Sequence, residues 1–209
     1  MYKEHWENIY STKTMTEVSW FQKIPETSLE LIKRVAKNKD ISIIDVGGGD
    51  GFLVDELIQL GYNNITVLDI SENAINKAKQ RLGEVAKNIK WIISDIIEFN
   101  PSDKYDIWHD RAVFHFLTED SDIEKYKSLV HLNVKKNGHF ILATFADTGP
   151  DKCSGLFVSK YSEKEHAVKF KDYFRPLDSF KYEHLTPFGT IQNFTCSVFN
   201  KNGTSLFCD

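Results

Sequence analysis

The chain has 209 residues, which is enough for one domain with a sizeable core. Hydrophobic residues make up 41% and charged residues 27%, the proportions of an ordinary globular protein. The net charge of −4 comes without a long basic run, which disfavours a nucleic-acid partner, and no apolar run is long enough to span a membrane.

The N-terminal residues and the cysteines indicate in which cellular compartment the protein is expected. Residues Met1–Trp6 are polar, unlike the apolar stretch of a secretory leader. The three cysteines are odd in number and widely spaced, so they fit neither a disulfide framework nor a zinc pattern. We therefore expect a cytoplasmic protein with no metal site.

Residues 1–40 are expected to form an N-terminal helical lid that is rich in aromatic residues. The aromatic residues fall in two short runs, His5–Tyr10 and Ser19–Phe21. Pro25 then opens a helix, because apolar residues recur after it at helical spacing. These apolar residues are Leu29, Ile32, Val35 and Ala36.

A run of β-branched residues at Ile41–Val46 predicts the first strand, and a glycine-rich turn, Asp45–Gly51, follows it directly. A helix predicted at 51–60 begins in this turn, so its free N–H groups face whatever ligand the turn binds. Residues without a Cβ allow the backbone to approach that ligand closely. The residues of the turn that we expect to bind it are Asp45, Gly47, Gly49 and Gly51.

The spacing and charge of this turn argue against two common phosphate-binding motifs. The dinucleotide-binding motif G-x-G-x-x-G would need a glycine where the chain has Phe52, and no Gly-Lys-Ser/Thr tripeptide of a phosphate loop follows. The carboxylates of Asp45 and Asp50 would also repel a pyrophosphate, whereas they suit a ligand with an ammonium or sulfonium group.

Helices and strands alternate through the rest of residues 41–146, which we expect to form a cofactor-binding core. A helix capped by Ser71 follows the second strand, and a helix over Ile123–Val130 leads to a turn at Lys136–Gly138. Alternation of this kind predicts a mostly parallel sheet with helices on both faces. The further strands are predicted at 64–69, 89–94, 105–109 and 139–145.

Residues 147–209 follow a different pattern and are expected to form the substrate side. Asp147–Phe157 has the composition of a loop, and Ser162–Phe170 that of a helix. Two apolar runs, Phe180–Leu185 and Thr190–Phe199, flank a Pro-Phe-Gly turn, which predicts an antiparallel hairpin. An all-parallel dinucleotide-binding sheet would not end in this way.

Acidic residues stand at the carboxyl ends of the second and third predicted strands, where open α/β sheets bind their ligands. Asp69 lies about twenty residues beyond the glycine turn, where an acid accepts both hydrogen bonds of a ribose diol. Asp95 ends the next strand, and Ile70 is placed to pack on an adenine face. Each acid alone also fits a helix-flanking or loop position, so the specific signal is their order along the chain.

The turn Asp45–Gly51, with Asp69 and Asp95 at successive strand ends, resembles the class I S-adenosylmethionine-dependent methyltransferases. The resemblance implies one domain over residues 1–209 with an α/β fold, namely a Rossmann-like, doubly wound seven-stranded sheet that is mostly parallel and ends in an antiparallel hairpin. It implies S-adenosylmethionine as the cofactor. It also implies that Asp95 receives the adenine amino group and that the backbone N–H of Ile96 meets the ring.

The N-terminal aromatic residues are similar to the lid of thiol, thiopurine and halide methyltransferases. This second resemblance implies that Trp20 packs over the cofactor, where a cation–π contact to the sulfonium is available. It also implies that Phe21 contacts the substrate. Trp6 and Tyr10 also fit a role as anchors of a terminal helix on the sheet.

The segment Trp108–Leu117, at the end of the fourth predicted strand, carries two histidines and an Asp-Arg pair. It resembles the block that class I methyltransferases carry at this place, which implies that His109 lines the methyl donor. His115 and Asp110 are the predicted catalytic residues, as base or substrate orienter. Arg111 is predicted to pair with a carboxylate of the substrate or of the protein.

Several of these residues also fit purely structural roles. Asp110 and Arg111 would fit a structural ion pair, and His115 a core histidine. Cys153 is predicted to contact the substrate, because loops after the strands form the pocket, although a lone cysteine is more often inert.

Together these patterns favour a methyltransferase that moves a methyl group by in-line displacement to a small molecule, with a thiol or other soft nucleophile as the preferred acceptor. The alternative is a protein-lysine N-methyltransferase, since compact enzymes of this fold also methylate proteins. A nicotinamide-dependent oxidoreductase and a non-catalytic cofactor-binding subunit are less favoured. We expect a small-molecule partner, no nucleic acid and no membrane, and the oligomeric state stays open.

Overall fold

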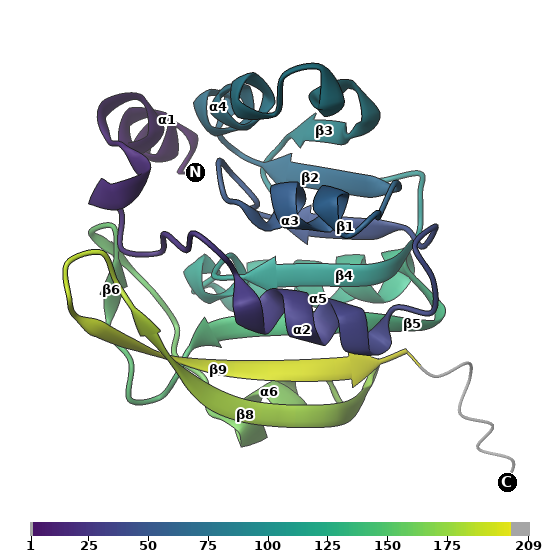
Figure 1. Ribbon diagram of the computed structural model, residues 1–209. Helices are drawn as coiled ribbons and strands as arrows, with labels where there is room; N and C mark the ends of the chain where they lie inside the picture. Colours follow the sequence, from purple (N-terminus) through teal and green to yellow (C-terminus); the bar gives the residue numbers. More distant parts are fainter. Residues whose placement is uncertain (1, 202–209) are drawn as a thin grey trace, which may run out of the picture.

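A seven-stranded sheet forms the centre of the protein in a computed structural model that describes residues 2–201 (Figure 1). The strand order is β3-β2-β1-β4-β5-β9-β8, in which the first five strands run parallel and β9 runs antiparallel between β5 and β8. The predicted Rossmann-like sheet with its C-terminal hairpin is therefore confirmed. Cys208 lies outside the described residues. The strands are β1 (Ile43–Val46), β2 (Ile65–Asp69), β3 (Lys90–Ile93), β4 (Tyr105–Arg111), β5 (Val134–Phe145), β8 (Arg175–Leu185) and β9 (Ile191–Asn200).

Helices cover both faces of the sheet, because successive strand residues point alternately into two apolar cores. Ile43 and Ile107 belong to the core beneath the three helices that cover one face, α2, α3 and α4. Their sequence neighbours Ile44 and Trp108 belong to the other core, beneath α5 and α6. The helices are α2 (Glu26–Val35), α3 (Leu53–Gln59), α4 (Glu72–Leu82), α5 (Asp120–Asn133) and α6 (Glu163–Phe170), with short helical turns at η2 (Gly83–Asn88) and η3 (Phe114–Phe116).

The central strands are longer than their apolar runs predict. β4 extends to Arg111, two residues beyond the predicted end. β5 begins at Val134, and the predicted turn at Lys136–Gly138 is an irregularity inside this strand, where the register with β4 shifts. Asn137 has a φ of 62° there, so the turn-forming residues do adopt a turn conformation without ending the strand.

Two segments of the last third also differ from their predicted form. β8 begins at Arg175, five residues before the predicted start at Phe180. The sequence did not signal its first half, because this edge strand is largely exposed and has only a weak apolar pattern. The predicted loop at 147–157 contains a small hairpin formed by β6 (Lys152–Cys153) and β7 (Leu156–Phe157).

The N-terminal segment forms a helix, α1 (Lys3–Thr12), and a helical turn, η1 (Met15–Glu17), which lie beside α4 at the edge of the sheet (Figure 1). The Glu7 carboxylate accepts hydrogen bonds from the backbone N–H groups of Glu72 (2.7 Å) and Asn73 (3.1 Å). The first N–H groups of a helix have no partner within it. Glu7 therefore caps α4 and fastens α1 next to the carboxyl end of β2.

Candidate active site

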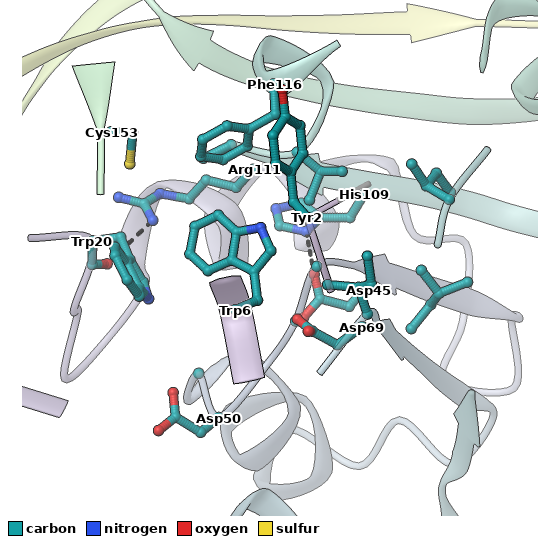
Figure 2. Close-up of a pocket in the computed structure, with 18 of the residues that line it drawn as sticks. Tyr2, Trp6, Trp20, Asp45, Asp50, Asp69, His109, Arg111, Phe116 and Cys153 are labelled. Carbon is teal, nitrogen blue, oxygen red and sulfur yellow. Dashed lines mark hydrogen bonds and ion pairs between the residues drawn. The ribbon is translucent and has the colours of Figure 1, made fainter. Parts of the chain in front are cut away.

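A cavity of about 510 Å³ opens at the carboxyl ends of the parallel strands, around the point where the strand order reverses between β1 and β4 (Figure 2). This volume is typical of small-molecule sites. The structure does not bring Gly49, Asp110 or His115 to the cavity wall. The predicted site residues that do line it are Trp20, Phe21, Asp45, Gly47, Gly51, Asp69, Ile70, Asp95, Ile96, His109, Arg111 and Cys153.

The turn after β1 leaves no room for a Cβ at its glycines Gly47, Gly48 and Gly49. A Cβ on Gly48 would lie 2.6 Å from Asp45 Oδ2, and a Cβ on Gly49 would lie 2.6 Å from the hydroxyl of Tyr10. Gly47 and Gly49 have φ values of 67° and 52°, which residues with a Cβ rarely adopt. Gly49 therefore shapes the site through its contact with Tyr10, without lining the cavity itself.

Asp69, at the end of β2, is a buried carboxylate among other acids. Burial raises its pKa to about 7; a hydrogen bond from the Ser71 N–H (2.8 Å) opposes this rise, whereas the charges of Asp50 and Asp45 add to it. A carboxylate in such a place is stabilised by a ligand that donates hydrogen bonds or carries positive charge.

The far end of the cavity, after β3, is apolar with a polar edge. Ile70, Ile96 and Ile97 line it together with Asp95, whose Oδ1 accepts a hydrogen bond from the Ile97 N–H at 3.0 Å. Such a combination suits a flat aromatic ring with an exocyclic polar group.

His109 joins β4 to the glycine turn. The strand register places it directly beside Asp45, and its Nδ1 lies 2.7 Å from Asp45 Oδ1 (Figure 2). Its Nε2 lies 2.9 Å from Oγ of Ser28, a cavity-lining residue of α2 that the sequence analysis missed. No local pattern signals Ser28, because its partner lies 81 positions further along the chain.

Arg111 lies two residues further along the same face of β4. Its guanidinium extends toward Trp20 and Cys153 and away from Asp69 (Figure 2). It donates to the Trp20 carbonyl (3.3 Å) and to the Tyr182 hydroxyl (3.4 Å), and it lies over the Phe194 ring, 4.8 Å from the centroid. Its Nη2 is buried without a hydrogen-bond partner. Within residues 2–201 no carboxylate forms an ion pair with it.

Aromatic side chains from three separate segments form a roof over the cavity, and we call Trp6, Trp20 and Phe116 the aromatic roof. The ring of Trp6 lies 5.7 Å from that of Trp20 and 5.2 Å from that of Phe116, with both pairs edge to face. All three line the cavity. Trp6 and Phe116 were not among the predicted site residues, and the dense aromatic residues of His5–Tyr10 are the signal that pointed to Trp6.

Asp110 and His115, the predicted catalytic residues, do not line the cavity. Side chains alternate along a strand, so Asp110 points away from the cavity, into the opposite core. Its carboxylate accepts hydrogen bonds from the N–H groups of Val113 (2.9 Å) and Phe114, and burial raises its pKa to about 6. Asp110 therefore shapes the turn after β4, and it forms no ion pair with Arg111.

His115 is a core histidine. It is fully buried, and its Nδ1 accepts a hydrogen bond from the Phe145 N–H at 3.3 Å. Burial, together with the nearby Arg111 charge, lowers its pKa to about 3. With a pKa of about 3, His115 is a weak base, and it does not line the cavity.

Cys153 and Phe21 do line the cavity. Cys153 comes from β6 and is buried, and burial raises the pKa of its thiol to about 12, although the Arg111 charge acts in the opposite direction. The thiol is therefore not ionised and serves as a wall. Phe21 packs edge to face against Phe52 at 6.0 Å, at the start of α3.

Two further findings concern metals and membranes. Among residues 2–201 no group of three or more His, Cys, Asp or Glu side chains is placed to hold a metal ion. None of the helices described is both long and apolar enough to cross a membrane.

A family model for the methyltransferase domain matches residues 37–183, which is most of the chain. The chain therefore belongs to this family, and it is a class I S-adenosylmethionine-dependent methyltransferase. The residues fit this cofactor: Asp69 suits a ribose diol, the acids of the glycine turn suit cationic groups, and the cavity after β3 suits an adenine ring.

The relatives differ in what they methylate. The chain is 32% identical to EEF1A lysine methyltransferase 2 of Mus musculus, across 98% of this chain and 84% of that protein. It is 29% identical to malonyl-[acyl-carrier protein] O-methyltransferase 1 of Ilyobacter polytropus, across 65% of this chain and about half, 49%, of that protein.

Solved structures show the same fold. The N-methyltransferase NodS of Bradyrhizobium japonicum, in complex with S-adenosylhomocysteine, superposes with a TM-score of 0.71 at 13% identity, over 97% of this chain and 100% of that one. A methyltransferase of Anabaena variabilis superposes with a TM-score of 0.73 at 16% identity, over 97% of this chain and 96% of that one.

Proposed function

We propose that the protein methylates a small molecule whose nucleophile reacts as an anion, with a thiolate as the preferred acceptor. The observation that carries this proposal is Arg111, a guanidinium in the cavity wall whose Nη2 is buried and unpaired. We also propose a cytoplasmic location, a compartment in which small thiols stay reduced.

The charge of Arg111 favours anions at its side of the cavity. An unpaired charge in a partly buried place is unfavourable until a ligand supplies the counter-charge, and guanidinium groups bind carboxylates and other anions with paired hydrogen bonds. The same charge lowers the pKa of the nearby Cys153 thiol against the effect of burial. It would act in the same direction on an acceptor thiol bound beside it.

The aromatic roof supports a small acceptor. Trp6 contacts both Trp20 and Phe116 over the cavity, so the methyl acceptor would lie beneath these rings rather than on an open surface. Excluding water strengthens the interaction of Arg111 with an anion. S-adenosylmethionine supplies the methyl group, and the chain supplies orientation and electrostatics.

A panel of acceptors tests the proposal. The protein would be incubated with S-adenosylmethionine that carries a labelled methyl group and with small thiols, carboxylates and amines in separate reactions. We expect methylated thiols, and methylated carboxylates would keep the anionic class while changing the nucleophile. Methylation of amines alone would contradict the proposal.

A protein lysine is the second candidate acceptor, because the mouse lysine methyltransferase matches 98% of this chain at 32% identity. The same labelled cofactor in a cell lysate distinguishes the two candidates. Label in the small-molecule fraction supports the first, and label on lysine side chains supports the second.

A further inference from the structure

Three residues that line the cavity form one hydrogen-bonded chain. Ser28 Oγ lies 2.9 Å from His109 Nε2, and His109 Nδ1 lies 2.7 Å from Asp45 Oδ1. Each residue is less than one tenth exposed. His109 is the one histidine among the described residues of the cavity wall. Because Asp110 and His115 lie outside the cavity, this chain holds the imidazole that is placed to receive a proton there.

Rigid elements hold the chain in place. Asp45 and His109 face each other in the register of β1 and β4, at the centre of the sheet. Ser28 stands in the first turn of α2, which packs on the same face of the sheet through Leu29 and Ile32. Such a placement fixes both hydrogen bonds without a mobile loop.

The hydrogen bonds fix the direction in which a proton can move. Asp45 as a carboxylate only accepts, so Nδ1 of a neutral His109 carries the proton and donates it to Asp45. Nε2 then accepts the hydrogen bond of the Ser28 hydroxyl. The lone pairs of Ser28 Oγ remain available to a donor in the cavity, and this order of groups is the one found in Ser-His-Asp triads.

We propose that Ser28, His109 and Asp45 form a proton relay that removes the proton of a protonated acceptor during methyl transfer. This inference rests on the proposed function. The acceptor proton passes to Ser28 Oγ while the Ser28 hydroxyl proton passes to His109 Nε2. The electron pair of the broken acceptor–hydrogen bond forms the bond to the methyl group, and the electrons of the methyl–sulfur bond stay on sulfur. The imidazolium, stabilised by Asp45, later releases its proton to solvent.

A series of thiols with pKa values below and above the assay pH tests the relay. Thiols that are already ionised need no base, so Ser28→Ala should change their kcat/KM less than about threefold. Thiols that are mostly protonated should lose about 100-fold, the scale of general base catalysis. Thr27→Ala is the matched control, because Thr27 is the neighbouring hydroxyl residue and does not line the cavity.

A structural role of Ser28 predicts a different result. The loss would then be equal for all thiols, or it would appear in the affinity for S-adenosylhomocysteine, and either outcome overturns the relay. If the wild-type protein methylates no thiol, the proposed function fails instead.

Nitrogen NMR of His109 tests the relay without any acceptor. A neutral ring with the proton on Nδ1 and an unprotonated, hydrogen-bonded Nε2 supports it, whereas a proton on Nε2 contradicts it.

Discussion

The two ends of the cavity are built in different ways. The cofactor end is made by strand ends and the turns after them, so Asp45, Asp69 and Asp95 follow each other at successive strands. The other end, which we propose binds the acceptor, is made by Trp6, Arg111 and other residues from segments far apart in the chain. The first arrangement is common to a whole fold family and defines the methyl donor. We propose that the second defines the acceptor.

The largest expected effect is a loss of cofactor affinity when the glycine turn is changed. Gly49→Ala would place a Cβ 2.6 Å from the Tyr10 hydroxyl and 3.2 Å from Asp69 Oδ2. We expect the affinity for S-adenosylhomocysteine, measured by calorimetry, to fall by about 100-fold or more, a loss of about 3 kcal/mol.

Gly61→Ala is the matched control for Gly49→Ala. Gly61 also has a positive φ, 84°, but no atom lies within 4 Å of its Cβ position. It should cost about 1–2 kcal/mol of stability and leave the affinity unchanged. An equal loss of affinity in both variants would show that backbone strain causes the loss, and not the close contact of the new Cβ with Tyr10.

A second large effect concerns Asp69, whose pKa is raised to about 7 in the folded protein. The folded state then binds more protons than the unfolded state between about pH 4 and pH 7, so this group's contribution to stability is lost as the pH rises through that range. Asp69→Asn should raise the melting temperature at pH 8 relative to wild type while it weakens cofactor binding. Thermal unfolding across this range measures the first effect.

Asp103→Asn is the control for that experiment, because Asp103 is an exposed carboxylate in a surface ion pair with Lys90. It should leave the slope of stability against pH nearly unchanged. If the stability of Asp69→Asn depended on pH as that of wild type does, the claim that ionised Asp69 destabilises the folded protein would be contradicted.

A smaller effect concerns the link between the two ends. Burial alone would raise the pKa of Glu7, but the hydrogen bonds from Glu72, Asn73 and Ser71 outweigh it and lower that pKa. Glu7→Ala should loosen α1 and with it Trp6 of the aromatic roof, which raises KM for the acceptor about fivefold and leaves kcat nearly unchanged. Glu4→Ala, on an exposed position of the same helix, is the control. A fall in kcat at constant KM would mean that the helix acts on the chemistry instead.

The smallest effect on turnover is expected for Asp110→Asn. Its hydrogen bonds to the turn after β4 would weaken, at a cost of about 1–3 kcal/mol in the free energy of unfolding. Turnover per folded molecule should stay within about twofold, because the side chain does not reach the cavity. A loss of turnover without a loss of stability would restore Asp110 as a catalytic residue.

Most of the residues predicted for the cofactor end line one cavity, and the signals that predicted them are local. A glycine turn and an acid at the end of an apolar strand are each read from a few neighbouring residues, and the fold places them together. The acceptor end needed information that is not local. The apolar pattern ended β4 at His109, so the alternation that turns Asp110 away from Arg111 was not visible. Ser28 gave no signal at all, because only the packing of α2 brings it to His109.

The most direct test of the assignment of Arg111 to the acceptor end is to compare two constants in Arg111→Ala. The account predicts that the affinity for S-adenosylhomocysteine stays within about threefold of wild type, while KM for the acceptor thiol rises by about 30-fold or more. Arg34→Ala, which removes a surface arginine paired with Asp178, should change neither constant. A large loss of cofactor affinity with an unchanged acceptor KM would contradict the account, because Arg111 would then hold the methyl donor.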